Sequence, residues 1–527
     1  MLLALAVAAA ARLVAPNWDA GIAAHPDERF LLGAAAATPL LGNPCRTTPD
    51  FPYGHLPVMI VRLIVLASGG ADPLYAARLL SGLIGVLLVA LSGACGRMLG
   101  GWRAATFALW VTALSPGLIQ QGHFYTVDPL GAVLAAGSVL AAARARWRWA
   151  GVLSGLAIAC KASLATSAVA LVVALWLAGR RAGAGAGVRV LLGFVLPCFV
   201  AFASVSPWSV ATPVACWRGP WMQAMLASGR WVFPYTQQYA GTWPWVYPLV
   251  QLALWGLGPV VAVLGAVGLA MRVGPARRGR LAGARPDLVW GILFFGATAA
   301  LRVKFPRYLL PLTPWWGAWA GRLLWGGRRT WAPWVRTTLA MAGAASTALL
   351  GIAQVGVYTQ IHPWVRASAW LEANLPAGAE VVVEAWDHPL PVPLPGSHTG
   401  NLRQVTLDVY AEEEMAKAAA LADASRAATT VLASRRGYGA LSREPARYPE
   451  TMAWYAKGLT EREVHAFVRC PRVGQVAITD DPLADAGLPV PVSLAQRCGT
   501  KWAMRLPRLD ESYRVYDAPL ALVLTRD

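Results

Sequence analysis

The sequence predicts a polytopic α-helical membrane protein with about eleven transmembrane helices and a C-terminal extracytoplasmic α/β domain. Hydrophobic residues make up 56% of the 527 residues and charged residues 14%, whereas soluble domains have about 45–50% and about 25%. The apolar residues form long runs with arginine clusters between them. This composition excludes a disordered chain and argues against an ordinary soluble protein.

A membrane-crossing helix needs about 20 apolar residues. The expected spans are 1–16, 76–96, 104–121, 127–143, 149–161, 162–178, 188–205, 246–271, 287–302, 308–325 and 336–358. The stretch 149–178 is short for two crossings, so we expect a shallow hairpin bent near Lys161. Residues 57–68 are apolar but short and contain Arg62, which favours an interfacial helix. The first run lacks a basic leader and a clear cleavage site, so we expect a membrane anchor rather than a signal peptide.

The formal charge of +19 comes mostly from arginines between the apolar runs, a pattern typical of cytoplasmic loops. With the N-terminus inside, five such clusters fall inside the cell. Residues 1–358 are then a transmembrane domain, and 359–527 are an extracytoplasmic domain. The expected outside loops are 17–75, with its interfacial helices, 122–126, 206–245 and 303–307. No basic groove with interleaved aromatic residues is visible, so we expect membrane lipids and no nucleic acid as partners.

The tail from about residue 359 alternates strand-like and helical patterns, which predicts a small α/β domain. The helical stretch 411–426 has acidic residues Glu412–Glu414 in its first turn, where negative charge suits the helix dipole. The segment 471–510 is rich in Pro and Asp and is expected to be an irregular insertion. Cys470 and Cys498 lie in a compartment that permits a disulfide, although the sequence does not show their separation. The strand-like runs are 380–386, 429–435 and 519–526.

Acidic residues stand at the start of two expected outside segments, in the motifs HPDE (25–28) and HFYTVDP (123–129). They can cap helices, because Pro and acids both favour a first helical turn. Asp27 or Glu28 can alternatively take a proton from an acceptor hydroxyl. If Asp128 meets Asp27 across a shared cavity, the two acids can hold one divalent cation or divide acid and base roles.

Cations and aromatic residues occupy the same expected face. Lys304 and Arg307 lie outside, against the general trend, which suits a lipid phosphate; snorkelling of long side chains is the alternative. The turn FPYGHLP (51–57) can place Tyr53 and His55 beside the acids. The full set of candidates is Asp27 and Glu28 for catalysis; Lys304, Arg307, Lys161 and His55 for phosphate; Tyr53, Tyr125 and Tyr308 for substrate; and Asp27 and Asp128 for a metal.

The HPDE loop, the HFYTVD turn, the bend at Lys161 and KFPRYLLPLTP (304–314) together resemble the GT-C superfamily of polytopic glycosyltransferases. The similarity is to the family 39 type, which includes protein O-mannosyltransferases and aminoarabinose transferases. The tail segments 362–391 and 511–524 resemble a bacterial branch of that family. The chain departs from many relatives at His55, where they have a Lys, and it lacks the accessory domain of the eukaryotic protein mannosyltransferases.

This resemblance implies a glycosyltransferase of the bacterial plasma (inner) membrane. A sugar on a polyprenyl phosphate would be transferred with inversion, outside the cytoplasm, to a lipid, glycan or protein hydroxyl. Asp27 would be the general base with Glu28 beside it, and Asp128 matches an acid that helps bind a metal in some relatives. A divalent metal cation is therefore the one cofactor to consider. A polytopic transporter or a lipid-linked sugar flippase is the alternative class, although transporters tend to carry repeated halves and mid-membrane charges.

Overall fold

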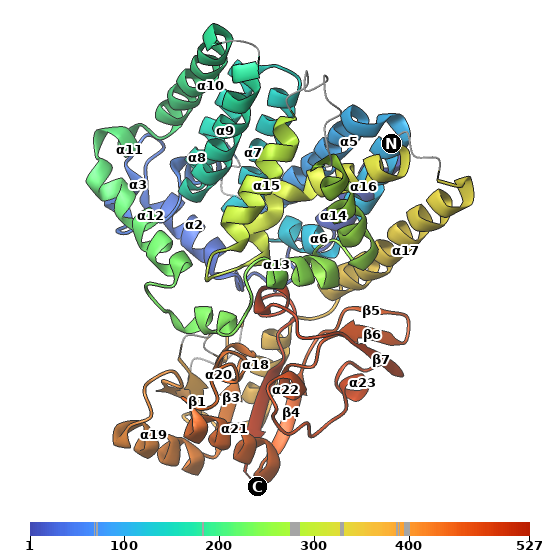
Figure 1. Ribbon diagram of the computed structural model, residues 1–527. Coiled ribbons are helices and arrows are strands. Elements are labelled where there is room, and N and C mark those ends of the chain that lie inside the picture. Colours follow the sequence, from blue (N-terminus) through green and yellow to red (C-terminus); the bar gives the residue numbers. More distant parts are fainter. Residues whose placement is uncertain are drawn as a thin grey trace. The chain divides into compact units, whose positions relative to one another are not determined.

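The computed structural model describes residues 1–67, 69, 72–181, 184–273, 285–326, 331–385, 388, 390–394 and 401–526. The chain divides into two compact units (Figure 1). The helical unit comprises Met1–Pro16, Pro26–Trp231 and Pro244–Gly351; the α/β unit comprises Asn17–His25, Val232–Trp243 and Ile352–Asp527. Two loop segments of the expected transmembrane domain therefore belong to the α/β unit.

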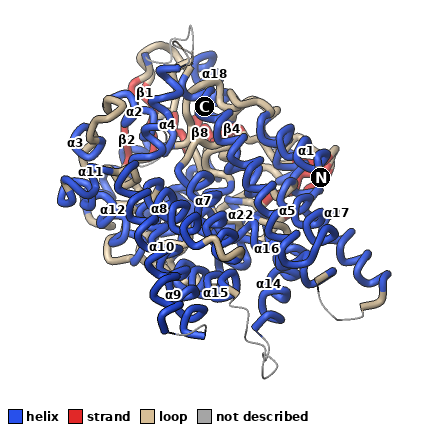
Figure 2. The backbone as a smooth tube through the Cα atoms, turned by 90° about the horizontal axis from the view of Figure 1, so that it is seen from above, coloured by secondary structure: helices blue, strands red, loops and turns tan. Residues whose placement is uncertain are grey.

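The helical unit is a bundle in which α5 packs against α1 and α16, and α8 packs against α7 and α10 (Figure 2). Short 3-10 turns, η1 (Ala162–Leu164) and η4 (Pro306–Leu312), precede α9 and α16. The last helix, α17, begins in the helical unit and ends in the α/β unit. The helices are α1 (Leu2–Leu13), α2 (Pro26–Ala37), α3 (Pro44–Thr47), α4 (His55–Ala67), α5 (Pro73–Ala113), α6 (Pro116–His123), α7 (Val127–Ala143), α8 (Trp147–Cys160), α9 (Ala165–Arg181), α10 (Ala184–Val205), α11 (Pro207–Ala211), α12 (Pro213–Ser228), α13 (Val246–Gln251), α14 (Pro259–Val273), α15 (Pro286–Ala299), α16 (Thr313–Trp325) and α17 (Pro333–Tyr358).

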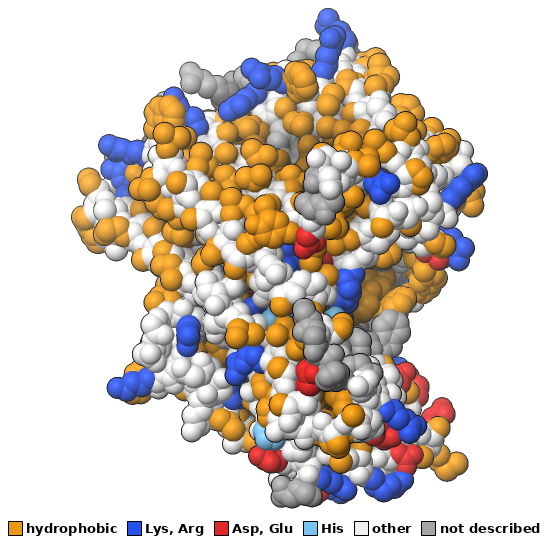
Figure 3. All heavy atoms as spheres, turned by 180° about the vertical axis from the view of Figure 1, so that it is seen from behind, with side chains coloured by type: hydrophobic (Ala, Val, Ile, Leu, Met, Phe, Trp, Pro, Cys, Tyr) orange, Lys and Arg blue, Asp and Glu red, His pale blue; other side chains and the backbone are white. Residues whose placement is uncertain are grey.

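Three helical stretches among the described residues are long and apolar enough to cross a membrane: Pro73–Ala113, Gly187–Val205 and Pro333–Asn374. Seven further apolar helices have 10–17 residues. Hydrophobic side chains cover much of the helical unit's surface in the view of Figure 3, as expected for a protein in contact with lipid. Eleven crossings remain a prediction.

The backbone breaks the apolar helices at Gly101, Gly258 and Lys161. The element α5 is two helices that meet at a kink at Gly101, where φ is 77° and ψ is −164°, so the spans expected at 76–96 and 104–121 stay separate; the second helix ends at Ala113, and α6 follows from Pro116. The span expected at 246–271 is interrupted, because Gly258 has a φ of 87° and Pro259 opens a new helix, α14. The bend expected near Lys161 is present: this residue is extended, with φ −153° and ψ 117°, and it separates α8 from η1 and α9.

The α/β unit contains a five-stranded mixed sheet in the order β2-β1-β3-β8-β4. Strand β1 pairs in parallel with β2 and β3, and β8 pairs antiparallel with β3 and β4. The three strand-like runs in the sequence correspond to the adjacent central strands β1, β3 and β8. The elements are α18 (Pro363–Asn374), β1 (Glu380–Glu384), β2 (Arg403–Leu407), α19 (Met415–Arg426), β3 (Thr429–Leu432), α20 (Arg436–Leu441), α21 (Pro449–Glu461), β4 (Glu463–Phe467), β5 (Arg472–Val473), β6 (Val476–Thr479), α22 (Pro482–Asp485), α23 (Leu494–Arg497), β7 (Trp502–Arg505) and β8 (Ala521–Thr525).

Two predictions for the tail were wrong in detail. The helix expected from residue 411 begins at Met415, and Glu413 instead accepts hydrogen bonds from the backbone of Glu450 and Thr451 at the start of α21. The segment expected to be irregular contains a second sheet, β5-β6-β7. A disulfide between Cys470 and Cys498 closes this segment.

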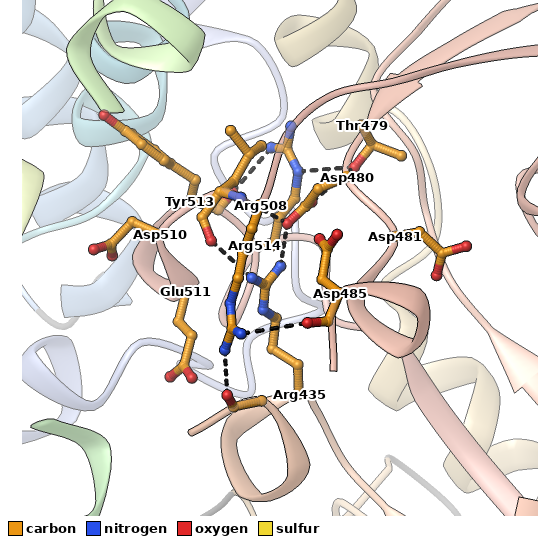
Figure 4. Close-up of polar contacts among 12 residues, drawn as sticks. Arg435, Thr479, Asp480, Asp481, Asp485, Arg508, Asp510, Glu511, Tyr513 and Arg514 are labelled. Carbon is orange, nitrogen blue, oxygen red and sulfur yellow. Dashed lines mark hydrogen bonds and ion pairs between the residues drawn. The ribbon is translucent and has the colours of Figure 1, made fainter. Parts of the chain in front are cut away.

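Buried charges organise the α/β unit beside this second sheet (Figure 4). Arg435 pairs with Asp480 at 2.5 Å, and Asp480 also accepts a hydrogen bond from the backbone of Leu509. Glu511 is 2% exposed, and neither of its carboxylate oxygens has a hydrogen-bond partner among the described residues. Burial raises the pKa of Glu511 to about 7, although Arg436 and Arg435 oppose the shift. This carboxyl therefore changes its charge near neutral pH.

Candidate active site

The helical unit brings one acid of the HPDE motif against a cation from a distant segment. Pro26 opens α2, so Asp27 lies in its first turn. Asp27 Oδ2 accepts a hydrogen bond from Arg307 Nη1 at 2.9 Å, and about a fifth of each side chain is exposed. The Tyr53 hydroxyl donates to the same carboxylate. Burial, followed by the charge of Asp27, raises the pKa of Tyr53 well above its usual value, so this phenol stays protonated.

The second acid completes the same cluster from the other side of Arg307. Asp128, in the first turn of α7, pairs with Lys161 Nζ at 2.7 Å. Its other oxygen, Oδ2, lies 3.7 Å from Arg307 Nε. The Lys161 ammonium also lies 4.8 Å from the ring centre of Tyr308. Asp27, Arg307, Asp128 and Lys161 thus form a chain of alternating charge, which we call the carboxylate–cation cluster.

Close backbone packing explains why these segments meet. The backbone N–H of Gly54 donates to the carbonyl oxygen of Cys160 at 3.0 Å, and Cys160 directly precedes Lys161. A Cβ at position 54 would lie 1.9 Å from the carbonyl oxygen of Ala159, so a residue without a side chain is required there. The turn that carries Tyr53 is therefore held against the end of α8.

The cluster is electrically balanced by its own side chains. Burial alone would lower the pKa of Arg307, but the carboxylates of Asp27 and Asp128 raise it well above its usual value. Two carboxylates face two cations, and a divalent metal would have to displace Arg307 and Lys161 to reach them. The Asp27–Asp128 pair in this arrangement does not fit a metal ion.

Glu28 is adjacent to Asp27 but lies in different surroundings. It is fully buried, and Arg78 of α5 donates to both of its oxygens, at 2.9 and 2.7 Å. The backbone N–H of Tyr125 also donates to Glu28, at 2.9 Å. Glu28 therefore connects α2, α5 and the turn that leads into α7. These contacts fix the positions of Asp27 and Asp128 and leave Glu28 no open face toward a substrate.

Other candidates also have structural contacts. The Tyr125 hydroxyl donates to the carbonyl of Pro57, and the side chain is 4% exposed. Lys304 is buried and donates to the carbonyl of Arg302. His55 is 3% exposed, and burial lowers its pKa to about 4, so it is neutral at physiological pH. A neutral imidazole offers no charge to a phosphate.

A disulfide and an arginine were missed at the sequence level. Cys45 in α3 and Cys216 in α12 form a disulfide, and His55 Nε2 lies 3.4 Å from the Cys45 sulfur. Both cysteines lie in loops expected on the same side of the membrane, which is a signal that could have found the pair. Arg78 lies in an expected span, where a charge by itself indicates a buried partner. Although the two sulfurs and His55 lie within 4.8 Å of one another, the S–S bond occupies both thiols, so this group does not fit a metal.

Neither a protein-family model nor a curated protein matches the sequence. Among solved structures, the Archaeoglobus fulgidus oligosaccharyltransferase is 14% identical, with 86% of this chain and 72% of that chain covered and a TM-score of 0.50. The archaeal oligosaccharyltransferase AglB from the same organism, in complex with an inhibitory peptide and a dolichol-phosphate, gives a TM-score of 0.51 at the same identity and coverage. ArnT from Cupriavidus metallidurans bound to undecaprenyl phosphate is 17% identical over 89% of this chain and 93% of that chain, with a TM-score of 0.45.

The protein has a GT-C fold. The expectation drawn from the HPDE and KFPRYLLPLTP motifs is confirmed at this level. At 14% identity, the similarity to the oligosaccharyltransferase relates the folds and assigns no residue roles.

Proposed function

We propose that this GT-C protein is a membrane glycosyltransferase that moves a sugar from a polyprenyl-phosphate carrier to an acceptor hydroxyl, with inversion, on the extracytoplasmic face. The carboxylate–cation cluster is the observation that carries the proposal. It offers a partly exposed acid for the acceptor and two cations for the phosphate. The GT-C fold favours this reaction over a transporter or flippase. The similar archaeal oligosaccharyltransferase AglB is in complex with a dolichol-phosphate, which supports a lipid-phosphate donor.

The leaving group is a phosphate, and its departure requires mainly charge neutralisation. The Arg307 guanidinium and the Lys161 ammonium belong to side chains that are partly exposed, so both groups can turn toward an anion. Arg307 offers a planar fork that matches phosphate geometry. When Arg307 binds the donor phosphate, its hydrogen bond to Asp27 is released, and Asp128 keeps Lys161 in place.

Asp27 then acts as the general base. The acceptor oxygen attacks the anomeric carbon of the sugar, the bond from that carbon to the phosphate oxygen breaks, and Asp27 takes the hydroxyl proton. A single displacement of this kind inverts the anomeric configuration. Tyr53 holds the carboxylate by its hydroxyl, and Glu28 positions both acids without touching substrate. Donor binding and base release are coupled in this scheme, because the same arginine serves both.

The test is transfer of a labelled sugar from polyprenyl phosphate donors by membranes that contain the protein. We expect Asp27→Asn to reduce transfer by roughly 10²- to 10⁴-fold, the range typical of a general base. Asp50→Asn is the matched control, because Asp50 lies in the same loop and pairs with the exposed Arg218. Full activity of a folded Asp27→Asn variant would overturn the assignment of the base.

A further inference from the structure

An open groove lies on the helical unit apart from the carboxylate–cation cluster. It has a volume of about 440 Å³, within the range of roughly 300–1,000 Å³ typical of ligand sites. The second half of α5, the end of α16 and the start of α17 form its walls. The lining residues are Trp102, Arg103, Thr106, Phe107, Trp110, Trp325, Ala340, Met341 and Ala344.

The path of α17 creates the groove. The second half of this helix packs on the bundle, where the Thr347 hydroxyl donates to the carbonyl of Leu257 at 3.1 Å. The first turns lie apart from α16 in Figures 1 and 2, and Trp334 and Met341 are 71% and 60% exposed. The floor is aromatic, with Phe107 and Trp325 rings 5.6 Å apart. A bundle in water would bury so large an apolar surface.

Three arginines that form no ion pair with a described residue belong to the helices around the groove. Arg103 lines it, and the Arg97 guanidinium lies 4.3 Å from the ring centre of Trp102. Arg336 lies one helical turn before Ala340. Within the described ranges, none of these three arginines forms an ion pair. Arg272, at the end of another apolar helix, differs from them because it pairs with the buried Asp287. A ligand with a negative charge would therefore complement these arginines.

We propose that this groove binds one anionic diacyl phospholipid from the leaflet at the cationic end of the bundle. An acyl chain would lie along Phe107, Trp110 and Met341, and the headgroup phosphate would meet Arg97 and Arg103. Aromatic residues and arginines of this kind recognise lipid at the membrane interface. The apolar face of a helix from a second copy could fill the groove, but it would bring no negative charge to the arginines.

The test counts lipids on the purified, delipidated full-length protein by native mass spectrometry. Phosphatidylglycerol and phosphatidylcholine are titrated separately. We expect one phosphatidylglycerol per chain at concentrations where phosphatidylcholine does not bind. The paired variant Arg97→Gln, Arg103→Gln should bind on the order of 30-fold more weakly, because each arginine near an anionic lipid surface contributes about fivefold to binding. Ala344→Trp should block binding by filling the groove, and Arg144→Gln with Arg148→Gln is the control for cations elsewhere.

Three results would overturn the proposal. Equal binding of the two lipids would remove the role of charge. Equal weakening by the control pair would show a general attraction to cationic loops. A lipid-free dimer that Ala344→Trp converts to a monomer would assign the groove to a second copy. If Ala344→Trp fails to fold, Ala344→Leu provides the same test with a smaller side chain.

Discussion

Replacing Glu28 with Gln separates a positioning role from a catalytic one. Glu28 and Arg78 are 0% and 2% exposed, and two hydrogen bonds join them. The amide keeps the shape of the side chain but leaves the Arg78 guanidinium buried without a counter-charge. Breaking a buried pair in this way costs about 3–5 kcal/mol. We expect a loss of this size in the stability of the helical unit, because the backbone N–H of Tyr125 bonds to the same carboxylate.

Thermal unfolding in one detergent, at one scan rate, measures this loss against wild type. Removing both charges, with Glu28→Leu and Arg78→Met, should recover much of the stability, since an apolar pair can replace a buried ion pair. Asp27→Asn should behave in the opposite way: nearly normal unfolding but little transfer, because its side chain is about one-fifth exposed. If Glu28→Gln unfolds like wild type and still abolishes transfer, Glu28 takes part in the chemistry and our reasoning fails.

Three further predictions concern other groups. Arg307→Ala should raise the donor KM more than the acceptor KM, and an unchanged donor KM in initial-rate measurements would contradict the phosphate role. Because the pKa of Glu511 is raised from 4.5 to about 7, the stability that this group provides is present below about pH 4.5 and is lost as pH rises to 7; Glu511→Gln should remove about 3 kcal/mol of that pH dependence in unfolding, while Glu461→Gln, at an exposed position, should leave it intact. Cys45→Ser should destabilise the protein by up to about 5 kcal/mol, since the disulfide to Cys216 closes a separation of 171 residues; a reductant that does not alter the unfolding temperature of wild type would argue against this disulfide.

Much of the local structure was readable from the sequence because local rules determine it. Proline opens α2 directly before Asp27, as the HPDE motif predicts. The chain bends at Lys161, where the apolar run was too long for one short helix and too short for two full spans. The strand-like runs became the central strands of the sheet, since β-branched residues in short runs favour buried strands.

The pairings could not be read because they join distant segments. Asp27 and Arg307 are 280 residues apart, and no local pattern reports that distance. Likewise, nothing in the HPDE motif shows which acid faces Arg78, because this depends on how α2 is rotated against α5. His55 illustrates the same limit: its motif placed it near Tyr53, but packing against the disulfide buried it.

The different surroundings of Asp27 and Glu28 follow from one geometric fact. Consecutive residues of an α-helix point about 100° apart, at 3.6 residues per turn. Inserting one residue in α2 between Glu28 and Leu31 would move Glu28 into the place of Asp27 and carry Asp27 about 100° further round the helix, because the buried Leu31, Ala34 and Ala35 keep the rest of the helix in its packing. The spacing between the acids and this apolar face is thus constrained together with the acids, and this turn should tolerate substitutions better than changes of length.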